Sequence, residues 1–293
     1  MPEPFVEAAP AKLNLALHVT GRRADGYHAL DMLVAFADVC DELEATPARR
    51  DSLSLSGPFA PALGTSEGNL VLRALATFRA RWPGTLPDGI ALRLKKNLPV
   101  AAGLGGGSAD AAAALRLFAT MADEEVAFPD LLAVATPLGA DVPMCLYSRP
   151  ALASGVGEII RPLKAFPACH AVLVNPLIPV VTADVFRRLE RRENPPLPQL
   201  GDPLGRPAQL GLWLDETRND LEPAAVALVP VIGELKARLA GIDGCILARM
   251  SGSGATVFGL FGSSAQAHQA AHDLRTQWPD YWVAAAPLLG VSG

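Results

Sequence analysis

Cysteine is scarce in this sequence of 293 residues, and its spacing excludes two ways of stabilising a fold. The four cysteines, which lie 105, 24 and 76 positions apart, are Cys40, Cys145, Cys169 and Cys245. This spacing matches neither a CxxC metal site nor a dense disulfide framework. We therefore expect buried thiols in a reducing compartment.

Long apolar runs are also lacking. No run approaches the roughly 20 apolar residues that a helix needs to cross a bilayer. The first four residues, Met-Pro-Glu-Pro, have neither the basic nor the apolar stretch of a secretory leader. We therefore expect a cytoplasmic protein that has no membrane partner. The sequence does not fix the oligomeric state, and a monomer and a homodimer both stay open.

Basic runs are missing too, and acidic residues are in slight excess. The chain has 25 Lys and Arg residues against 30 Asp and Glu residues, a net charge of −5. This balance argues against a general DNA or RNA binder, so no nucleic-acid partner is expected. It does not exclude a small anionic ligand, because a few backbone amides are enough to hold one.

Glycine and proline, in contrast, are abundant, with 26 residues of each. Together they make up about 18% of the chain, compared with a usual share of roughly 12%. Hydrophobic residues still account for 50% of the chain, which is ample for a folded core. The length is at the upper limit for one core, and we predict two domains, residues 1–155 and 156–293.

Residue alternation predicts strands near the N-terminus. Between residues 12 and 19, leucine and valine lie on one face and Lys12, Asn14, Ala16 and His18 on the other, which predicts a half-buried strand. Residues 27–36 and 52–56 also read as extended, so the first quarter is predicted to form an antiparallel sheet. Later strands are predicted over residues 90–94, 171–174, 245–249 and 256–261.

Helices alternate with these strands, which makes the predicted class α+β. Apolar residues at helical spacing predict a helix over 69–82, and an alanine-rich helix is predicted over 111–119. Further helices are predicted over residues 129–136, 182–189 with Thr182 as cap, 230–239 and 264–278. The proline-rich segment 193–211 is interpreted as a surface insertion without an ordered element.

The strongest local motif is the glycine-rich run 103–107, which leads into the alanine-rich helix. Glycines let backbone amides approach an oxyanion closely, and a helix N-terminus favours phosphate. The run is neither a Walker A sequence nor a GxGxxG fingerprint. A second loop, 251–254, lies between two predicted strands and could equally be a tight hairpin or a ligand contact.

Single residues are less informative. Lys12 could be catalytic, but periodicity alone favours an ammonium group that reaches water past an apolar strand. Asp141, before a Val-Pro step, could equally be a turn or helix cap. Tyr27 and His28 could bind a base or could pack at the start of a strand.

One histidine pair has the spacing of metal ligands. His268 and His272 are four residues apart on a predicted helix, so both side chains could reach one ion. No HExxH pattern accompanies them, and a solvated helix face is the favoured interpretation. We predict no protein metal centre there.

Taken together, four segments resemble the GHMP small-molecule kinase superfamily. They are PAKLNL with DGYH near the N-terminus, residues 99–112 with GLGGGSADAA, residues 139–143, and residues 250–258. The resemblance spans nearly the whole chain and is faint only over 193–211. It is closest to members that act on a cytidine diphosphate substrate, a small molecule.

The resemblance implies a two-domain kinase fold with mixed and antiparallel sheets, ATP as cosubstrate and Mg²⁺ near the phosphates. It implies that Lys12 and Asp141 are the catalytic pair at the acceptor hydroxyl, with Asp141 as base. The ATP-binding residues that it implies are Pro99, Ala102, Gly103, Leu104, Gly105, Gly106, Gly107, Ser108 and Ala109. The substrate-binding residues that it implies are Asn14, Tyr27, His28, Thr182 and Phe186.

Two departures from the family pattern affect fine positioning only. Ala109 stands where a second serine is frequent, and Met144 stands where an aromatic residue is common. Neither removes a charged group. The alternatives are another GHMP kinase, for homoserine, a mevalonate derivative or a sugar, or a non-catalytic nucleotide- or RNA-binding module.

Overall fold

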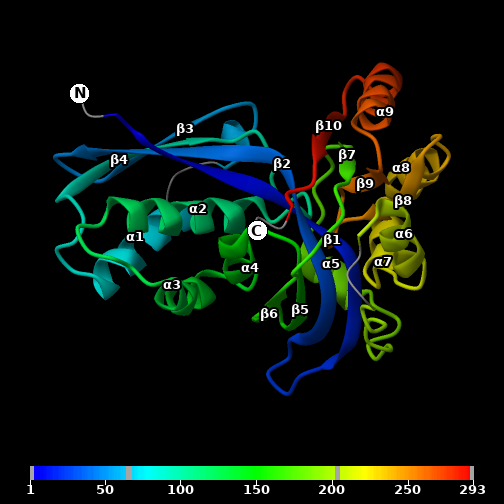
Figure 1. Cartoon of the computed structure of the whole chain (residues 1–293), viewed down its shortest axis with the longest axis horizontal. Coiled ribbons are helices and arrows are strands. Elements are labelled where there is room, and N and C mark those ends of the chain that lie inside the picture. The colour runs from blue at the N-terminus through cyan, green and yellow to red at the C-terminus, as the bar shows by residue number, and fades with distance from the viewer. Residues whose placement is uncertain (1–2, 64–67, 202–204, 291–293) are drawn as a thin grey trace. The chain divides into compact units, whose positions relative to one another are not determined.

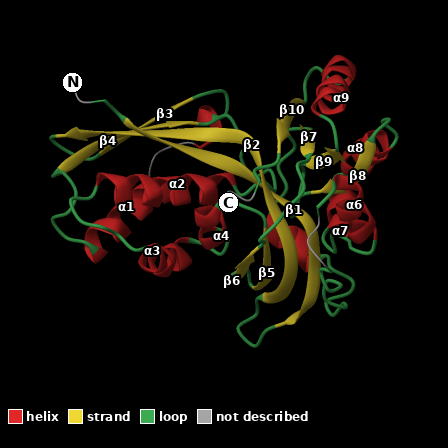
Figure 2. Ribbon diagram, in the orientation of Figure 1, coloured by secondary structure: helices red, strands yellow, loops and turns green. Residues whose placement is uncertain are grey.

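The computed structural model describes residues 3–63, 68–201 and 205–290, and it divides into two compact units (Figures 1 and 2). Unit one comprises the described residues of segments 1–11, 40–100 and 105–147. Unit two comprises those of segments 12–39, 101–104 and 148–293. Strands β1 (Phe5–Arg22) and β2 (His28–Ala48) contribute residues to both units. The domain division at residue 155 stays a prediction.

Unit one is a sheet covered by helices. Strand β4 (Gly89–Lys95) pairs antiparallel with residues 42–48 of β2 and parallel with β3 (Ser52–Ser56). The prediction of an antiparallel first quarter is therefore wrong for β3. The helices, drawn on one side of these strands in Figure 1, are α1 (Leu70–Arg81), α2 (Gly106–Met121), α3 (Phe128–Ala135) and α4 (Val142–Tyr147). Two short 3₁₀ helices, η1 (Ala60–Leu63) and η2 (Thr136–Leu138), complete the unit.

Helix α1 forms where the sequence predicts it. Asn69 caps it, since its side chain accepts a hydrogen bond from the Val71 amide at 2.9 Å. The buried face then carries Phe78, whose ring lies 4.5 Å from that of Trp82 and 5.8 Å from that of Phe118 on α2. These aromatic contacts join α1 to α2.

Helix α2 is buried along most of its length. Four consecutive alanines, residues 111–114, have no exposed surface, so small side chains let the helix pack closely against its neighbours. The helix begins at Gly106, five residues earlier than the alanine run that predicts it. Its first turn is therefore built from the glycine-rich run itself.

Unit two centres on an antiparallel four-stranded sheet in the order β10-β7-β9-β8. Its strands are β7 (His170–Asn175), β8 (Cys245–Met250), β9 (Val257–Phe261) and β10 (Trp282–Pro287). A second pair, β5 (Ala151–Gly155) and β6 (Ile159–Pro162), continues from residues 30–34 of β2. The helices are α5 (Thr182–Arg187), α6 (Pro207–Asp215), α7 (Glu222–Leu228), α8 (Val231–Ala240) and α9 (Ser264–Gln277).

Residues 12–19 of β1 are buried on both faces, so the predicted half-buried strand is wrong. Lys12, Asn14 and His18, on the polar face, are only 4%, 1% and 1% exposed. Segment 217–220 covers this strand, since the Leu17 amide donates to the Arg218 carbonyl and the Asp220 amide donates to the Leu17 carbonyl, both at 2.9 Å. The alternation of apolar and polar residues cannot predict that a distant segment will bury the polar face of a strand.

The proline-rich segment 193–211 is more ordered than the sequence predicts. The Asn194 amide donates to the Val19 carbonyl at 3.1 Å, and the Leu197 amide donates to Asp31 Oδ2 at 2.9 Å. Pro207 is the first residue of α6, a position that suits its fixed φ angle. Residues 193–201 form no helix or strand, as predicted, although the bonds of Asn194 and Leu197 attach them to β1 and β2. The interpretation is wrong at the C-terminal end, where α6 begins, and residues 202–204 lie outside the described residues.

His18 holds this segment through a defined tautomer. Its Nδ1 lies 3.0 Å from the Pro195 carbonyl, which can only accept, and its Nε2 accepts from the Arg218 amide at 3.1 Å. The ring is therefore neutral with its proton on Nδ1. Burial also lowers the pKa of His18 below its ordinary value.

In the described ranges, no helix is long and apolar enough to span a membrane.

Candidate functional site

The glycine-rich run adopts a backbone that requires glycine at two positions. Gly103 and Gly105 have φ angles of 76° and 63°, in the left-handed region. A Cβ atom at Gly103 would lie 2.3 Å from the Ser251 carbonyl oxygen. The chain passes from unit two to unit one between Leu104 and Gly105.

The first turn of α2 offers backbone donors to an anion. The Ala109 amide makes the first intrahelical bond, to the Gly105 carbonyl at 2.8 Å, and no side chain caps the helix. The amides of Gly106, Gly107 and Ser108 therefore precede that bond, at the positive end of the helix dipole. This is the arrangement that binds phosphate.

The remaining residues of the predicted ATP loop support its backbone. Pro99, Ala102, Leu104 and Ala109 are buried. Within unit two, the Ala102 carbonyl accepts from the Thr256 amide at 3.2 Å, and the Leu104 carbonyl accepts from the Lys12 amide at 2.9 Å. These bonds fix the approach to the glycines.

The hairpin loop 251–254 packs on the glycine-rich run in unit two. Ser251 Oγ donates to the Gly103 carbonyl at 2.8 Å and accepts from the Asn14 amide at 3.2 Å. Asn219 Nδ2 donates to the carbonyls of Met250 and Gly252, both at 2.8 Å. The loop is thus a tight turn that also holds the glycine-rich run. The sequence gives no sign of Asn219, which lies in no predicted element.

Lys12 and Asn14 lie together on one face of β1, as the alternation predicts. Lys12 Nζ donates to Asn14 Oδ1 at 3.0 Å, and both side chains are buried. Asn14 Nδ2 lies 3.2 Å from the sulfur of Met32. The interpretation in which the Lys12 ammonium simply reaches water is therefore wrong.

Asp141 lies at the start of α4 in unit one. Its carbonyl accepts from the Cys145 amide at 3.1 Å, so it opens the helix as one of its two interpretations predicts, and its side chain is half-buried. A Cβ atom at nearby Gly139 would lie 4.0 Å from Ser108 Oγ. The segment before Asp141 therefore passes close to the first turn of α2. Met144 is fully buried and fills the core beneath.

The predicted base-binding residues gather in unit two. The rings of His28 and Phe186 stack at 4.9 Å with an interplanar angle of 23°. Tyr27, which precedes His28 in the sequence, is 65% exposed. Burial, followed by the charges of Arg192 and Arg22, lowers the pKa of His28, so its ring is neutral at pH 7. In the described part of the chain, buried His28 Nε2 has no hydrogen-bond partner.

Thr182 is the first residue of α5 and not its cap, since Val181 holds the cap position. Its hydroxyl lies 2.8 Å from Ser253 Oγ. Thr182 therefore joins α5, which carries Phe186, to the hairpin loop. The Thr182 hydroxyl therefore makes a tertiary contact with Ser253 and does not cap α5 as predicted.

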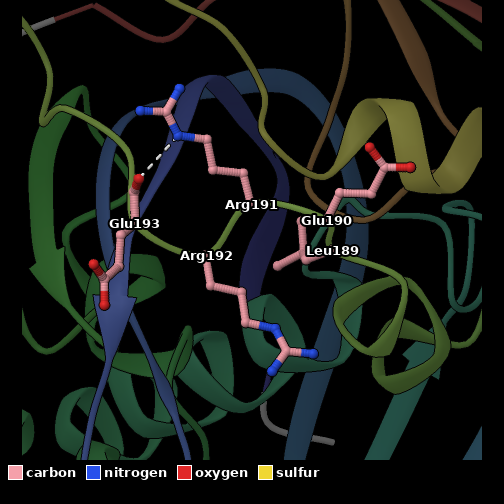
Figure 3. A pocket seen from close by; sticks show the side chains of 5 residues that line it. All are labelled: Leu189, Glu190, Arg191, Arg192 and Glu193. Atoms are coloured by element: carbon pink, nitrogen blue, oxygen red, sulfur yellow. Dashed lines mark hydrogen bonds between the residues drawn. The ribbon is translucent and has the colours of Figure 1, made fainter.

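A surface hollow follows α5 and is lined by Leu189, Glu190, Arg191, Arg192 and Glu193 (Figure 3). Arg191 Nε donates to the Glu193 carbonyl at 3.1 Å, and the side chains of Arg191 and Arg192 point away from each other. Arg192 is one of the two arginines, with Arg22, whose charge lowers the pKa of His28.

No group of three or more His, Cys, Asp or Glu residues able to hold a metal occurs in the described residues. His268 and His272 are exposed on α9, in agreement with a solvated helix face.

The comparisons with known proteins agree with this fold and this loop. Residues 69–149 match the family described as GHMP kinases N terminal domain, and residues 197–280 match GHMP kinases C terminal. A homoserine kinase structure from Cytophaga hutchinsonii, at 19% identity, has a TM-score of 0.70 over 99% of this chain and 98% of its own, which supports the same fold. The fold and the glycine-rich run define a GHMP kinase.

Relatives narrow the family further. The chain is 51% identical to the 4-diphosphocytidyl-2-C-methyl-D-erythritol kinase of Cereibacter sphaeroides over 96% of this chain and 98% of the relative. It is 49% identical to the kinase of the same name from Dinoroseobacter shibae, over 97% and 95%. A crystal structure of 4-(cytidine 5'-diphospho)-2C-methyl-D-erythritol kinase, 35% identical, has a TM-score of 0.79 over 98% of this chain and 100% of its own. The chain belongs to the 4-diphosphocytidyl-2-C-methyl-D-erythritol kinase family.

Proposed function

We propose that this kinase transfers the γ-phosphoryl group of ATP to the 2-hydroxyl of 4-diphosphocytidyl-2-C-methyl-D-erythritol, a step in non-mevalonate isoprenoid precursor synthesis. The observation that carries the proposal is family membership at 51% identity over nearly the full chain. The left-handed glycines that open α2 and the stacked His28 and Phe186 rings support it independently.

ATP binds through the backbone of residues 103–108, and Pro99, Ala102 and Ala109 hold that backbone in place. Phosphoryl transfer requires mainly alignment and neutralisation of phosphate oxygens, which the first-turn amides of α2 supply. Gly103 and Gly105 are needed because their φ angles exclude side chains.

Mg²⁺ accompanies the nucleotide. The described residues offer no cage of three metal-ligating side chains, which fits an ion that keeps its waters and is held largely by substrate phosphates. When bound, the ion neutralises charge on the phosphates. The loop backbone of residues 103–108 positions those phosphates.

Asp141 and Lys12 act on the acceptor hydroxyl. Asp141 orients the hydroxyl and accepts its proton, which becomes acidic late in a loose transition state. The Lys12 ammonium group offsets the negative charge that develops there. The 3.0 Å bond from Lys12 to Asn14 supports this role, because it holds the ammonium group in one place without neutralising it.

The cytidine group is bound in unit two. Tyr27 and Phe186 supply aromatic faces for stacking, while His28 hydrogen-bonds the base edge and Asn14 and Thr182 complete the site. The buried, unsatisfied Nε2 of a neutral His28 supports this assignment, because such an atom gains most from a ligand partner. A substrate of this kind requires no nucleic-acid or membrane partner, and a cytoplasmic monomer or homodimer is the form we propose.

Replacement of the proposed base tests the mechanism. Asp141→Asn should lower kcat by at least about 100-fold, the usual scale of positioned acid–base catalysis, and should leave ATP binding nearly unchanged. Steady-state kinetics and equilibrium ATP binding measure the two effects. Asp123→Asn, which makes the same charge change at an exposed residue, is the control. Near-normal turnover by Asp141→Asn would contradict the assignment.

Truncation of the stacked ring tests the cytidine site. Phe186→Ala should raise KM for the cytidine substrate about 10-fold, the loss of roughly one stacking contact, with KM for ATP unchanged. Phe128→Ala is the matched control, because Phe128 also pairs with a ring at 4.9 Å, that of Tyr147 in unit one. Equal effects of both variants on KM would contradict a binding role for Phe186.

A further inference from the structure

Three buried charges lie together in unit one, outside the residues assigned above. Lys96 donates to Asp41 Oδ2 and, at 2.5 Å, to Asp110 Oδ2. The side chains of Asp41, Lys96 and Asp110 are 0%, 3% and 5% exposed. The cluster therefore places two carboxylates and one ammonium group in the interior, where an excess charge is costly.

The two carboxylates are not equivalent. Asp41 Oδ1 accepts from the amides of Asn97 and Leu98 at 2.6 and 2.9 Å, so both of its oxygens are hydrogen-bonded. Asp110 Oδ1 is buried and, in the described part of the chain, has no hydrogen-bond partner. Hydrogen bonds to a carboxylate favour its ionised form, so of the two carboxylates Asp110 is the one that holds a proton more readily.

The cluster lies directly beneath the first turn of α2. A Cβ atom at Gly106 would lie 3.6 Å from Lys96 Nζ and 3.7 Å from Asp41 Oδ2. Asp110 itself belongs to the second turn of the helix. An ionised Asp110 would therefore compete with a bound phosphate for the positive end of α2.

We propose that Asp110 is a positioning residue that sets the charge beneath the phosphate-binding turn. As a neutral acid it leaves the amide end of α2 available to the nucleotide, and as a carboxylate it weakens nucleotide binding. The inference rests on the proposed binding of ATP at residues 103–108. Asp110 touches neither reactant and acts through the helix end alone.

The charges around Asp110 support a change of state near neutral pH. Burial raises the pKa of Asp110 to about 7; Lys96 opposes this shift and Asp41 adds to it. Helix α4 carries no charged residue. On α1 and α2 the charged groups form ion pairs, Arg116 with Glu7, Arg79 with Asp51 and Arg81 with Asp130, or are exposed, as Arg73 is. On β2 and β4, Arg93 pairs with Glu44, Lys95 is exposed and Glu42 is half-buried.

Nucleotide affinity should then fall as Asp110 ionises. A unit charge within about 10 Å of a polyphosphate should weaken binding roughly 5- to 10-fold between pH 6 and pH 8.5 after screening. By linkage, nucleotide binding near pH 7 should take up a fraction of a proton. At saturating ATP, kcat should not share this dependence, because Asp110 does not act on the acceptor.

The first experiment measures the dissociation constant and KM of ATP, with excess Mg²⁺, from pH 6 to 8.5. The wild-type enzyme should lose affinity with rising pH beyond the loss shown by Asp110→Asn, whose amide cannot ionise. Glu124→Gln, the same charge change at an exposed residue, should behave as wild type. Identical pH slopes in wild type and Asp110→Asn would overturn the inference.

A second measurement needs no variant. Calorimetric titration of the wild-type enzyme with ATP and excess Mg²⁺ at pH 7, in two buffers of different ionisation enthalpy, reports the protons taken up. Net uptake is expected, and uptake of zero or release of protons would overturn the inference. Absence of ATP binding at every pH would instead contradict the proposed function itself, so the two failures are distinguishable.

Discussion

Both units contain a buried cation outside the proposed catalytic pair, Lys96 in unit one and Arg249 in unit two, and these two cations are held in different ways. Lys96 in unit one donates to two carboxylates. Arg249 in unit two, 6% exposed, donates to the carbonyls of Leu15, Leu214 and Thr217 at 2.6, 3.0 and 2.9 Å and to the Thr217 hydroxyl at 2.9 Å. Lys96 is thus bound by two carboxyl groups, and burial raises the pKa of one of them, Asp110, to about 7, whereas Arg249 is bound by uncharged carbonyl and hydroxyl groups.

Because their partners differ, the environment of Lys96 changes its charge with pH, whereas the environment of Arg249 does not. Burial lowers the pKa of Lys96, but the two carboxylates outweigh it and raise that pKa, so Lys96 stays charged while Asp110 titrates. Burial lowers the pKa of Arg249 to about 10, which still leaves it cationic at pH 7. Arg249 lies on β8, just before the loop that contains Ser251. Its hydrogen bonds connect β1, which carries Lys12 and Asn14, to the end of α6.

The largest effect should follow removal of the Lys96 charge. Lys96→Met leaves two buried carboxylates without their cation and should lower the free energy of unfolding by about 3–5 kcal/mol. The loss should be smaller at pH 5, where Asp110 is neutral. Denaturant titration measures it, with Lys95→Met, at the exposed neighbour, as control. A loss as small as that of the control would show that the cluster contributes little.

A slightly smaller effect is expected at Arg249. Arg249→Met removes a donor from three carbonyls, those of Leu15, Leu214 and Thr217, and should lower the free energy of unfolding by about 3 kcal/mol. Unlike the Lys96 variant, it should show the same loss at pH 5 and pH 8, because no partner titrates. Arg238→Met, at an exposed arginine of α8, is the control. A strong pH dependence at Arg249 would break the comparison.

The smallest expected effect is a change in the pH dependence of stability when Asp110 is replaced by asparagine. Folding raises the pKa of Asp110 from 3.8 to about 7, so the unfolded chain ionises first and wild-type stability falls between these two pH values. Relative to wild type, Asp110→Asn should gain about 2–3 kcal/mol between pH 5 and pH 8. Thermal or denaturant unfolding at both pH values checks it. A constant difference would contradict a raised pKa.

The sequence predicts the local parts of this structure well. Asn69 and the apolar spacing after it are enough to predict α1, and the glycines before an alanine run are enough to predict the start of α2. The β8–β9 hairpin also follows from local pattern. In each case the determining interactions lie within a few residues, which is the range that periodicity and capping report.

The parts that sequence reasoning missed depend on distant partners. Lys96 and Asp110 look like ordinary surface charges in sequence, and only Asp41, 55 positions from Lys96, makes their burial tolerable. Arg249 is likewise buried because Leu15, 234 positions away, supplies a carbonyl. Strand β10 and helix α7 were missed because both are short and are stabilised by packing.

The most direct test of the central claim is ADP release by the purified enzyme with ATP, Mg²⁺ and one acceptor at a time. The acceptors are 4-diphosphocytidyl-2-C-methyl-D-erythritol, homoserine and phosphomevalonate, which separate this family from other GHMP kinases. The proposed function predicts turnover with the cytidine diphosphate substrate, whose product carries phosphate on the 2-hydroxyl, and little above background with the other two. Faster turnover of homoserine or phosphomevalonate would contradict it.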